Sequence, residues 1–149
     1  MSLAEQKAVD VAKEMPEGTV ILGSDTVVAA DGKILGKPKS HEEAYEMIRR
    51  LAGRSHQVYT GVCLVKKGPE GEADTVVSFY DETDVNVSPM TEKEIREYAD
   101  SEEPMDKAGS YAVQGFFARY IDGLKGSYAN VMGLPVHLVY QELKKLGAL

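Results

Sequence analysis

Asp25 is the residue of this 149-residue sequence whose surroundings most clearly suit chemistry, since it lies between the hydroxyl side chains of Ser24 and Thr26. It follows an apolar segment, residues 19–22, which is typical of a strand buried on both faces. In open α/β sheets, ligands collect beyond the carboxyl ends of such strands. A carboxylate there must be solvated, paired or bound to a metal, because an isolated buried charge is very costly. From residue types alone two interpretations stay open: Asp25 caps a turn, or it performs chemistry.

Two lysines and an amide lie in loops farther along the chain. Lys37 directly precedes Pro38, which restricts its backbone to extended geometry and so directs its ammonium group. Lys107 and Gln114 lie in an irregular segment, residues 101–115. Each lysine alone is most simply a solvated surface charge. Together with one aspartate they fit a site for phosphate and a divalent metal, because lysine brings positive charge to phosphate and Mg²⁺ prefers oxygen ligands.

Composition argues against several classes of function. A net charge of -7 disfavours a surface that coats nucleic acid, and no apolar run is long enough to span a bilayer. The single cysteine, Cys63, excludes an internal disulfide and suits a reducing compartment. His41, His56 and His137 lack the spacing of a metal site, so we expect them at a helix start, in a turn and on a helix surface. The sequence therefore predicts a cytoplasmic protein that binds neither nucleic acid nor membrane.

The pattern of apolar residues and capping signals predicts one α/β unit with a mixed sheet. Ser40 with Glu43 and Thr91 with Glu94 predict two capped helix starts, and residues 31–32 predict a tight turn. We expect helices within residues 4–15, 41–52, 92–99 and 135–146, and strands at residues 19–22, 27–30, 34–35, 58–65 and 75–87. The core-facing residues are expected to include Ala4, Ala8, Val11, Ala12 and Met15 in the first helix and Val136, Val139, Tyr140, Leu143 and Leu146 in the last.

Six segments, in order, carry a further signal: AEQKA at 4–8, SDTVV at 24–28, LGKP at 35–38, LAGR to VYTGV at 51–62, PMDKAGSYAVQG at 104–115 and GSYANVMGLP at 126–135. In order and spacing they resemble the Maf family of nucleotide pyrophosphatases over nearly the whole chain. The resemblance implies a single elongated domain, residues 1–149, with a twisted sheet flanked by helices and two lobes around a cleft. It also implies a homodimer and a divalent metal, Mg²⁺ or Mn²⁺.

The activity that the resemblance implies is hydrolysis of a nucleoside triphosphate to the monophosphate and pyrophosphate. Asp25 matches the catalytic aspartate of the family, which activates the attacking water or holds the metal. Lys7 and Lys37 match lysines that contact the triphosphate. Thr26 and Gln114 match positions that separate the branches of the family by substrate, and here they resemble the branch acting on dTTP and UTP.

Ser24 and Lys107 lie within the matched segments and complete the expected substrate-binding set. One departure concerns the N-terminus, where the family has a strand and a Ser-x-Ser-Pro-Arg-Arg turn that this sequence does not contain. That turn supplies arginines and helix N-terminal amides to phosphates. We therefore expect a domain that is N-terminally truncated relative to the family.

Two other functions stay open at this stage. One is a non-catalytic, nucleotide-binding regulator of cell division, acting in septum formation. The other is a pyrophosphatase that removes modified or non-canonical nucleotides. The sequence does not separate these from hydrolysis of dTTP and UTP.

Overall fold

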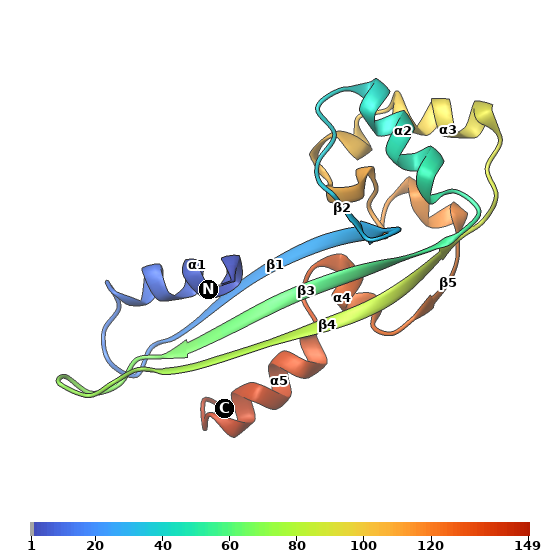
Figure 1. Cartoon of the computed structure of the whole chain (residues 1–149). Coiled ribbons are helices and arrows are strands. Elements are labelled where there is room, and N and C mark those ends of the chain that lie inside the picture. The colour runs from blue at the N-terminus through green and yellow to red at the C-terminus, as the bar shows by residue number, and fades with distance from the viewer. Residues whose placement is uncertain (1) are drawn as a thin grey trace.

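The computed structural model describes residues 2–149 and shows a long twisted sheet with helices on both faces (Figure 1). The strands are β1 (Val20–Ala30), β2 (Lys33–Leu35), β3 (Ser55–Lys66), β4 (Thr75–Val87) and β5 (Ile121–Lys125). The α-helices are α1 (Leu3–Ala12), α2 (His41–Leu51), α3 (Glu92–Ala99), α4 (Tyr128–Met132) and α5 (Val136–Lys145). Three 3₁₀ helices are η1 (Glu103–Asp106), η2 (Ala108–Ser110) and η3 (Phe116–Tyr120). None of the described helices has the length and apolar character of a membrane span.

The five strands lie in the order β2-β1-β3-β4-β5, and each neighbouring pair is antiparallel. The expected α/β class with a helix-flanked, twisted sheet is confirmed, but the sheet is antiparallel where we expected a mixed one. The β1–β2 and β3–β4 pairs are joined directly by hairpin loops, whereas helices lie in the connections between the β1–β3 and β4–β5 pairs. The predicted turn at Asp31 and Gly32 is confirmed: both residues have positive φ, 51° and 75°, as a two-residue hairpin requires.

β1 is longer than predicted and runs straight through Asp25. Its register with β3 extends from Val20, opposite Lys66, to Ala29, opposite Gln57. This continuous ladder holds the chain extended, so the prediction that the strand ends before Asp25 is wrong. The prediction of burial on both faces is also wrong, because neighbouring side chains face opposite sides and Leu22 is 40% exposed.

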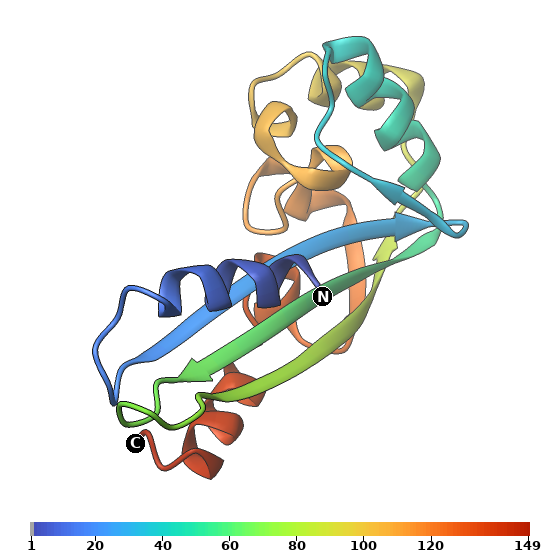
Figure 2. The same ribbon diagram turned by 60° about the vertical axis from the view of Figure 1, so that its left-hand side comes forward.

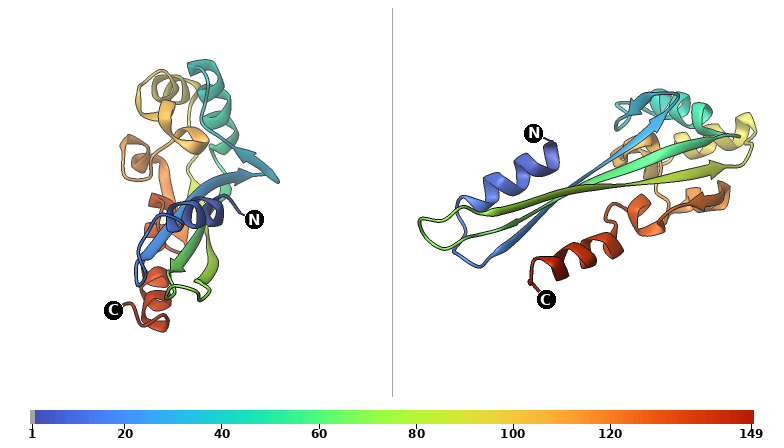
Figure 3. Two further views of the ribbon diagram at one scale, coloured as in Figure 1. Left: turned by 90° about the vertical axis from the view of Figure 1, so that its left-hand side faces the viewer. Right: turned by 60° about the horizontal axis from the view of Figure 1, so that its bottom comes forward.

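The molecule is elongated, with helices gathered at different places along the sheet (Figure 2). α1 lies along β1 and β3, while α2, α3 and the 3₁₀ helices gather at the far end of the strands. α4 and α5 lie on the face opposite α1 (Figure 3). A large core fills the end near α2 and α3, and a smaller one lies under α1. The arrangement therefore has two separately packed parts on one sheet.

The helix starts follow the predicted capping signals. Ser40 Oγ accepts a hydrogen bond from the Glu43 amide at 3.1 Å. Thr91 and Glu94 form the full capping box, with reciprocal bonds of 3.1 and 2.9 Å. Both α2 and α3 therefore begin directly after the capping residues that the sequence predicts.

The predicted inward faces of the first and last helices are only partly confirmed. The alanines of α1 and Val139 of α5 are buried, but Val11, Met15, Val136 and Tyr140 are 47%, 40%, 55% and 52% exposed. Each of these helices contacts one face of a narrow sheet, which covers only a thin stripe of the helix.

Gly23 allows α1 to approach the sheet closely. A Cβ atom at this position would lie 2.5 Å from the Ala4 carbonyl oxygen and 3.1 Å from the Ala8 Cβ. The alanines on the inner face of α1 fit the same requirement, since they add the smallest side chain. Backbone contact of this kind leaves no room for a methyl group unless the helix moves.

We expect Gly23→Ala to lower the free energy of unfolding by about 1–3 kcal/mol, the usual range for overpacking. Gly61→Ala is the matched control, because Gly61 lies on the neighbouring strand and an added Cβ would have no atom within 4 Å. Urea unfolding of both variants measures the difference. Equal stability of the two variants would show that α1 does not depend on this contact.

Candidate functional site

Asp25 and Thr26 lie on opposite faces of the sheet. Asp25 is in register with Gly61 and faces α1, whereas Thr26 is in register with Thr60 and faces α4. Neighbouring residues of a strand must point to opposite faces, so the long β1 makes this separation unavoidable. The residues expected to form one site therefore fall into two groups that flank the same strand.

The first group is an ion pair between Lys7 of α1 and Asp25. The Lys7 Nζ lies 3.9 Å from Asp25 Oδ1, and the two side chains are 55% and 34% exposed. Asp25 lines a shallow cavity of about 270 Å³ together with Tyr59 and Tyr80 from the next strands. An exposed pair adds little to stability. Because the Asp25 side chain is partly exposed, its carboxylate is open to solvent and to a ligand.

The second group lines a cleft of about 210 Å³ on the other face of β1. The lining residues are Thr26, Val28, Val58, Asp106, Lys107, Ala108, Tyr111, Ala112, Val113, Gln114, Val131, Met132 and Gly133. The segment from Lys107 to Gln114, which we call the cleft wall, therefore brings a cation and an amide to one side. The end of α4 forms the opposite side.

Two consecutive residues of the cleft wall have left-handed backbone geometry. Gly109 has φ 73° and Ser110 has φ 69°, and Ser110 is fully buried with its hydroxyl 3.0 Å from Met47 Sδ. A Cβ on Gly109 would lie 2.8 Å from the Val28 side chain. The Gly109 amide also donates to the Gly36 carbonyl at 3.1 Å. The wall is thus pressed against β1 and joined to the loop after β2.

Buried hydroxyl and amide groups hold α4 against the sheet. Thr60 Oγ1 donates to the Asn130 carbonyl at 3.1 Å and lies 2.9 Å from Thr26 Oγ1. The Asn130 amide donates to the Val58 carbonyl at 3.2 Å and to Thr83 Oγ1 at 2.9 Å. Each hydroxyl has one proton, so two arrangements fit: Thr26 donates to Thr60 and Thr60 to the Asn130 carbonyl, or Thr60 donates to Thr26 and Thr26 to the Gly133 carbonyl at 3.5 Å. In both arrangements the Thr26 proton is taken up within the protein. Thr26 therefore keeps an acceptor lone pair for the cleft.

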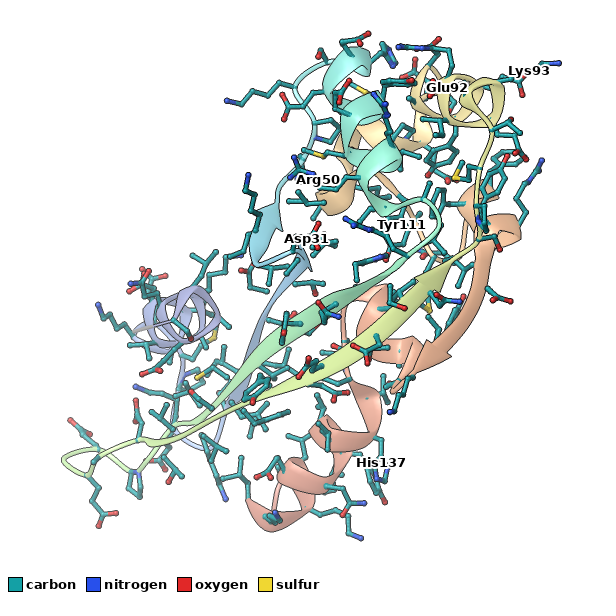
Figure 4. The ribbon with its side chains drawn as sticks, turned by 45° about the vertical axis from the view of Figure 1, so that its right-hand side comes forward. Asp31, Arg50, Glu92, Lys93, Tyr111 and His137 are labelled. Carbon is teal, nitrogen blue, oxygen red and sulfur yellow. The ribbon has the colours of Figure 1, made fainter. Side chains whose placement is uncertain are left out.

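A buried histidine, His56, lies behind the cleft wall. Its Nε2 is 2.7 Å from the Tyr111 hydroxyl, the two rings meet edge to face at 5.4 Å, and its Nδ1 has no hydrogen-bond partner among the described residues. Burial lowers the pKa of His56 from 6.5 to about 4, so the ring is neutral at pH 7. In Figure 4 Tyr111 is seen between α2 and the strands.

Sequence reasoning missed His56, and the turn that we predicted for it is wrong. β3 starts at Ser55, and its alternate residues His56, Val58 and Thr60 are all buried. That alternation was the available signal. His137 does lie on the outer face of α5, as predicted (Figure 4), and His41 is the first residue of α2.

The structure brings together some of the predicted site residues and separates others. Thr26, Lys107 and Gln114 share the cleft, and Lys7 meets Asp25 on the other face. Their roles in binding and catalysis stay predictions.

Lys37 and Ser24 lie outside both groups. Lys37 is exposed and does not line the cleft, although the Gly36 carbonyl is bonded to the cleft wall. Ser24 lies two residues before Thr26 on the same face of β1 and is half-buried. The structure places both residues beside the cleft rather than in it.

The donor set can be tested against the expected divalent metal. Residues 2–149 contain no group of three or more His, Cys, Asp or Glu side chains that could hold a metal ion. Mg²⁺ is often bound by one or two carboxylates, with substrate phosphates and water as its other ligands. The accessible carboxylate of Asp25 fits the protein's share of that arrangement.

The fold and site define an α/β protein with a cleft of about 210 Å³, lined by polar and apolar residues, on the face of β1 opposite Asp25. The chain belongs to the Maf family: the family model described as Maf-like protein matches residues 1–146. It is 48% identical over 147 residues to the dTTP/UTP pyrophosphatase of Lachnoclostridium phytofermentans, an alignment covering 99% of this chain and 74% of that protein. It is 47% identical over 162 residues to the dTTP/UTP pyrophosphatase of Agathobacter rectalis, covering 99% and 77%. The corresponding protein of Carboxydothermus hydrogenoformans is 48% identical over 147 residues, covering 99% and 76%.

The depressed pKa of His56 predicts a loss of stability in mild acid. Between pH 6.5 and about 4 the unfolded chain binds a proton at this ring that the folded chain does not, so stability falls as pH falls. The expected contribution of His56 is a loss of about 2 kcal/mol between pH 7 and pH 5.

Urea unfolding at both pH values measures this loss, with His56→Gln as the reference. The variant keeps all carboxylates and the other two histidines, so the difference between the two pH dependences isolates His56. Parallel pH dependences would contradict the prediction.

Proposed function

We propose that this chain is a metal-dependent nucleoside triphosphate pyrophosphatase that acts on dTTP and UTP. One observation carries the proposal: a cleft lined by Thr26, Lys107 and Gln114 lies directly across β1 from the Asp25–Lys7 pair. The names of the similar proteins support the substrate class.

The polar groups of the cleft suit a uracil or thymine base. These bases carry one ring N–H donor between two carbonyl acceptors. Thr26 offers a lone pair, because its proton goes to Thr60 or to the Gly133 carbonyl, and the Gln114 amide can both donate and accept. A cytosine ring has an acceptor nitrogen in place of the N–H group. Its lone pair would face the lone pair of the Thr26 oxygen, and no hydrogen bond would form between them. This difference favours the uracil-like bases.

The reaction requires an attacking water, a stabilised leaving group and a fixed geometry. Water attacks the α-phosphorus, the bond from that phosphorus to the bridging oxygen breaks, and pyrophosphate leaves. Asp25 orients the water and accepts its proton, or holds the metal, and Lys7 offsets negative charge beside it. A divalent metal, when bound, neutralises charge on the phosphate oxygens and the leaving pyrophosphate. Lys107 contributes positive charge from the side of the cleft.

The open edge of β1 provides a path between the two groups. β2 pairs only with Val28, Ala29 and Ala30, and within residues 2–149 no strand pairs with this edge between Val20 and Val27. A triphosphate whose base lies in the cleft would reach Asp25 by crossing this edge. Because backbone groups alternate along a strand, amides near Ser24 and Thr26 point outward there and can donate to phosphate oxygens.

The activity predicts pyrophosphate release from dTTP and UTP in the presence of Mg²⁺ or Mn²⁺. We expect turnover of CTP to be at least about tenfold slower, since one mispaired polar group in a base site typically costs 1–3 kcal/mol. Removal of the metal with EDTA should abolish turnover, and added Mn²⁺ should restore it. Equal rates on all pyrimidine and purine triphosphates would contradict the assigned base preference.

Asp25→Asn should lower kcat by about 10²–10⁴-fold, the usual contribution of a positioned general base, with little change in stability. Asp10→Asn is the matched control, because Asp10 forms an exposed ion pair with Lys13 at 3.4 Å on the same helix as Lys7. Steady-state kinetics and thermal unfolding of both variants separate catalysis from folding. Wild-type turnover in Asp25→Asn would remove Asp25 from the proposed site.

The separation of Asp25 from the cleft favours a second candidate, a nucleotide-binding regulator without turnover. This function predicts that dTTP raises the unfolding temperature while no pyrophosphate is released. The same two assays therefore distinguish the candidates. The homodimer expected from the family resemblance stays a prediction, and sedimentation of the purified chain tests it.

A further inference from the structure

His56 has a feature that packing alone does not explain. The His56 side chain is fully buried, and its Nδ1 has no hydrogen-bond partner among the described residues. An unpaired buried polar atom is destabilising, whereas an apolar side chain of similar size would leave no such atom. Among the described residues, the His56 side chain makes one hydrogen bond, between its Nε2 and the Tyr111 hydroxyl at 2.7 Å.

Tyr111 fixes the strained part of the cleft wall. It directly follows Gly109 and Ser110, whose φ values of 73° and 69° are both in the left-handed region. A non-glycine residue in this region is unfavourable by about 1 kcal/mol and persists only where its surroundings hold it. The Tyr111 ring packs against Phe117 at 4.9 Å, and its hydroxyl meets His56 of β3. The bond thus joins the wall to the central sheet.

The residues that this bond positions lie on either side of it. Lys107 is four residues before Tyr111 and Gln114 is three residues after it, and both line the cleft. A rotation of the wall about Tyr111 would displace the cation and the amide together. Small displacements of binding groups have large effects on recognition.

We infer that His56 is a positioning residue that acts through Tyr111 to hold Lys107 and Gln114 in place for the nucleotide. The inference rests on the proposed function, because it assigns the cleft to the substrate. His56 does not touch the substrate itself. Its neutral ring supplies a fixed hydrogen-bond partner on the rigid strand β3, and the cleft wall takes its position from that bond.

Three variants test the inference. Tyr111→Phe removes the hydroxyl and keeps the ring, His56→Leu removes the partner, and His56→Gln keeps a polar group that can bond to Tyr111. Tyr45→Phe is the matched control, because Tyr45 also packs on the large core and its hydroxyl donates to Glu92, away from the cleft.

We expect Tyr111→Phe and His56→Leu to lower kcat/KM for dTTP about tenfold, mainly through KM, and to reduce the preference for dTTP over CTP. The kcat/KM of His56→Gln should stay within about threefold of the wild-type value, and the kcat/KM of Tyr45→Phe should equal the wild-type value. A purely structural role would lower the unfolding temperature of the variants and leave KM and base preference unchanged. That result would overturn the inference.

Amide hydrogen exchange gives a readout that does not depend on activity. Without nucleotide, residues 107–114 should exchange about tenfold faster in Tyr111→Phe than in the wild type and in Tyr45→Phe. Unchanged exchange would overturn the inference even if the enzyme is active. If the wild type hydrolyses no nucleotide but exchange changes as expected, the proposed function fails while the link from His56 to the cleft wall stands.

Discussion

The register of β1 against β3 determines which face of the sheet each candidate residue occupies. Thr26 lies opposite Thr60 and Asp25 opposite Gly61, and a shift of one residue would exchange the two faces. The register is itself secured on both sides. Gly23 meets α1 through close backbone contact, and Thr26 is bonded to Thr60 beneath α4. The position of each polar group therefore follows from a pairing that packing on both faces enforces.

The polar groups beneath α4 extend this control to the cleft. Asn130 lies fully buried, and its amide bonds join the short α4 to β3 and β4. A five-residue helix has little stability of its own, so tertiary contacts must hold it. The Asn130 and Gly133 carbonyls at this helix are the acceptors for the bonded pair of Thr60 and Thr26 hydroxyls. One network thus sets both the shape of the cleft and the hydrogen-bonding character of its floor.

The parts of the fold that could be predicted from sequence are those governed by local chemistry. The capping box of Thr91 and Glu94 and the turn at residues 31–32 depend on neighbours in the chain, and both form as predicted. The full length of β1, and the face that Asp25 occupies, depend on pairing with a strand more than thirty residues away. The burial of His56 follows the alternation along β3, but the bond that pairs its ring depends on Tyr111, 55 residues farther along the chain.

Departures from local rules are concentrated around the cleft. α2 and α3 have good caps, acidic first turns and basic last turns, so each level of their sequence agrees with the fold. The cleft wall instead contains a left-handed, buried Ser110, and behind it lies His56 with an unpaired nitrogen. Each feature lowers stability, and neither is needed to close the core, since apolar residues would fill the same space. Such costs are retained where geometry has a use, and here they surround the segment that carries Lys107 and Gln114.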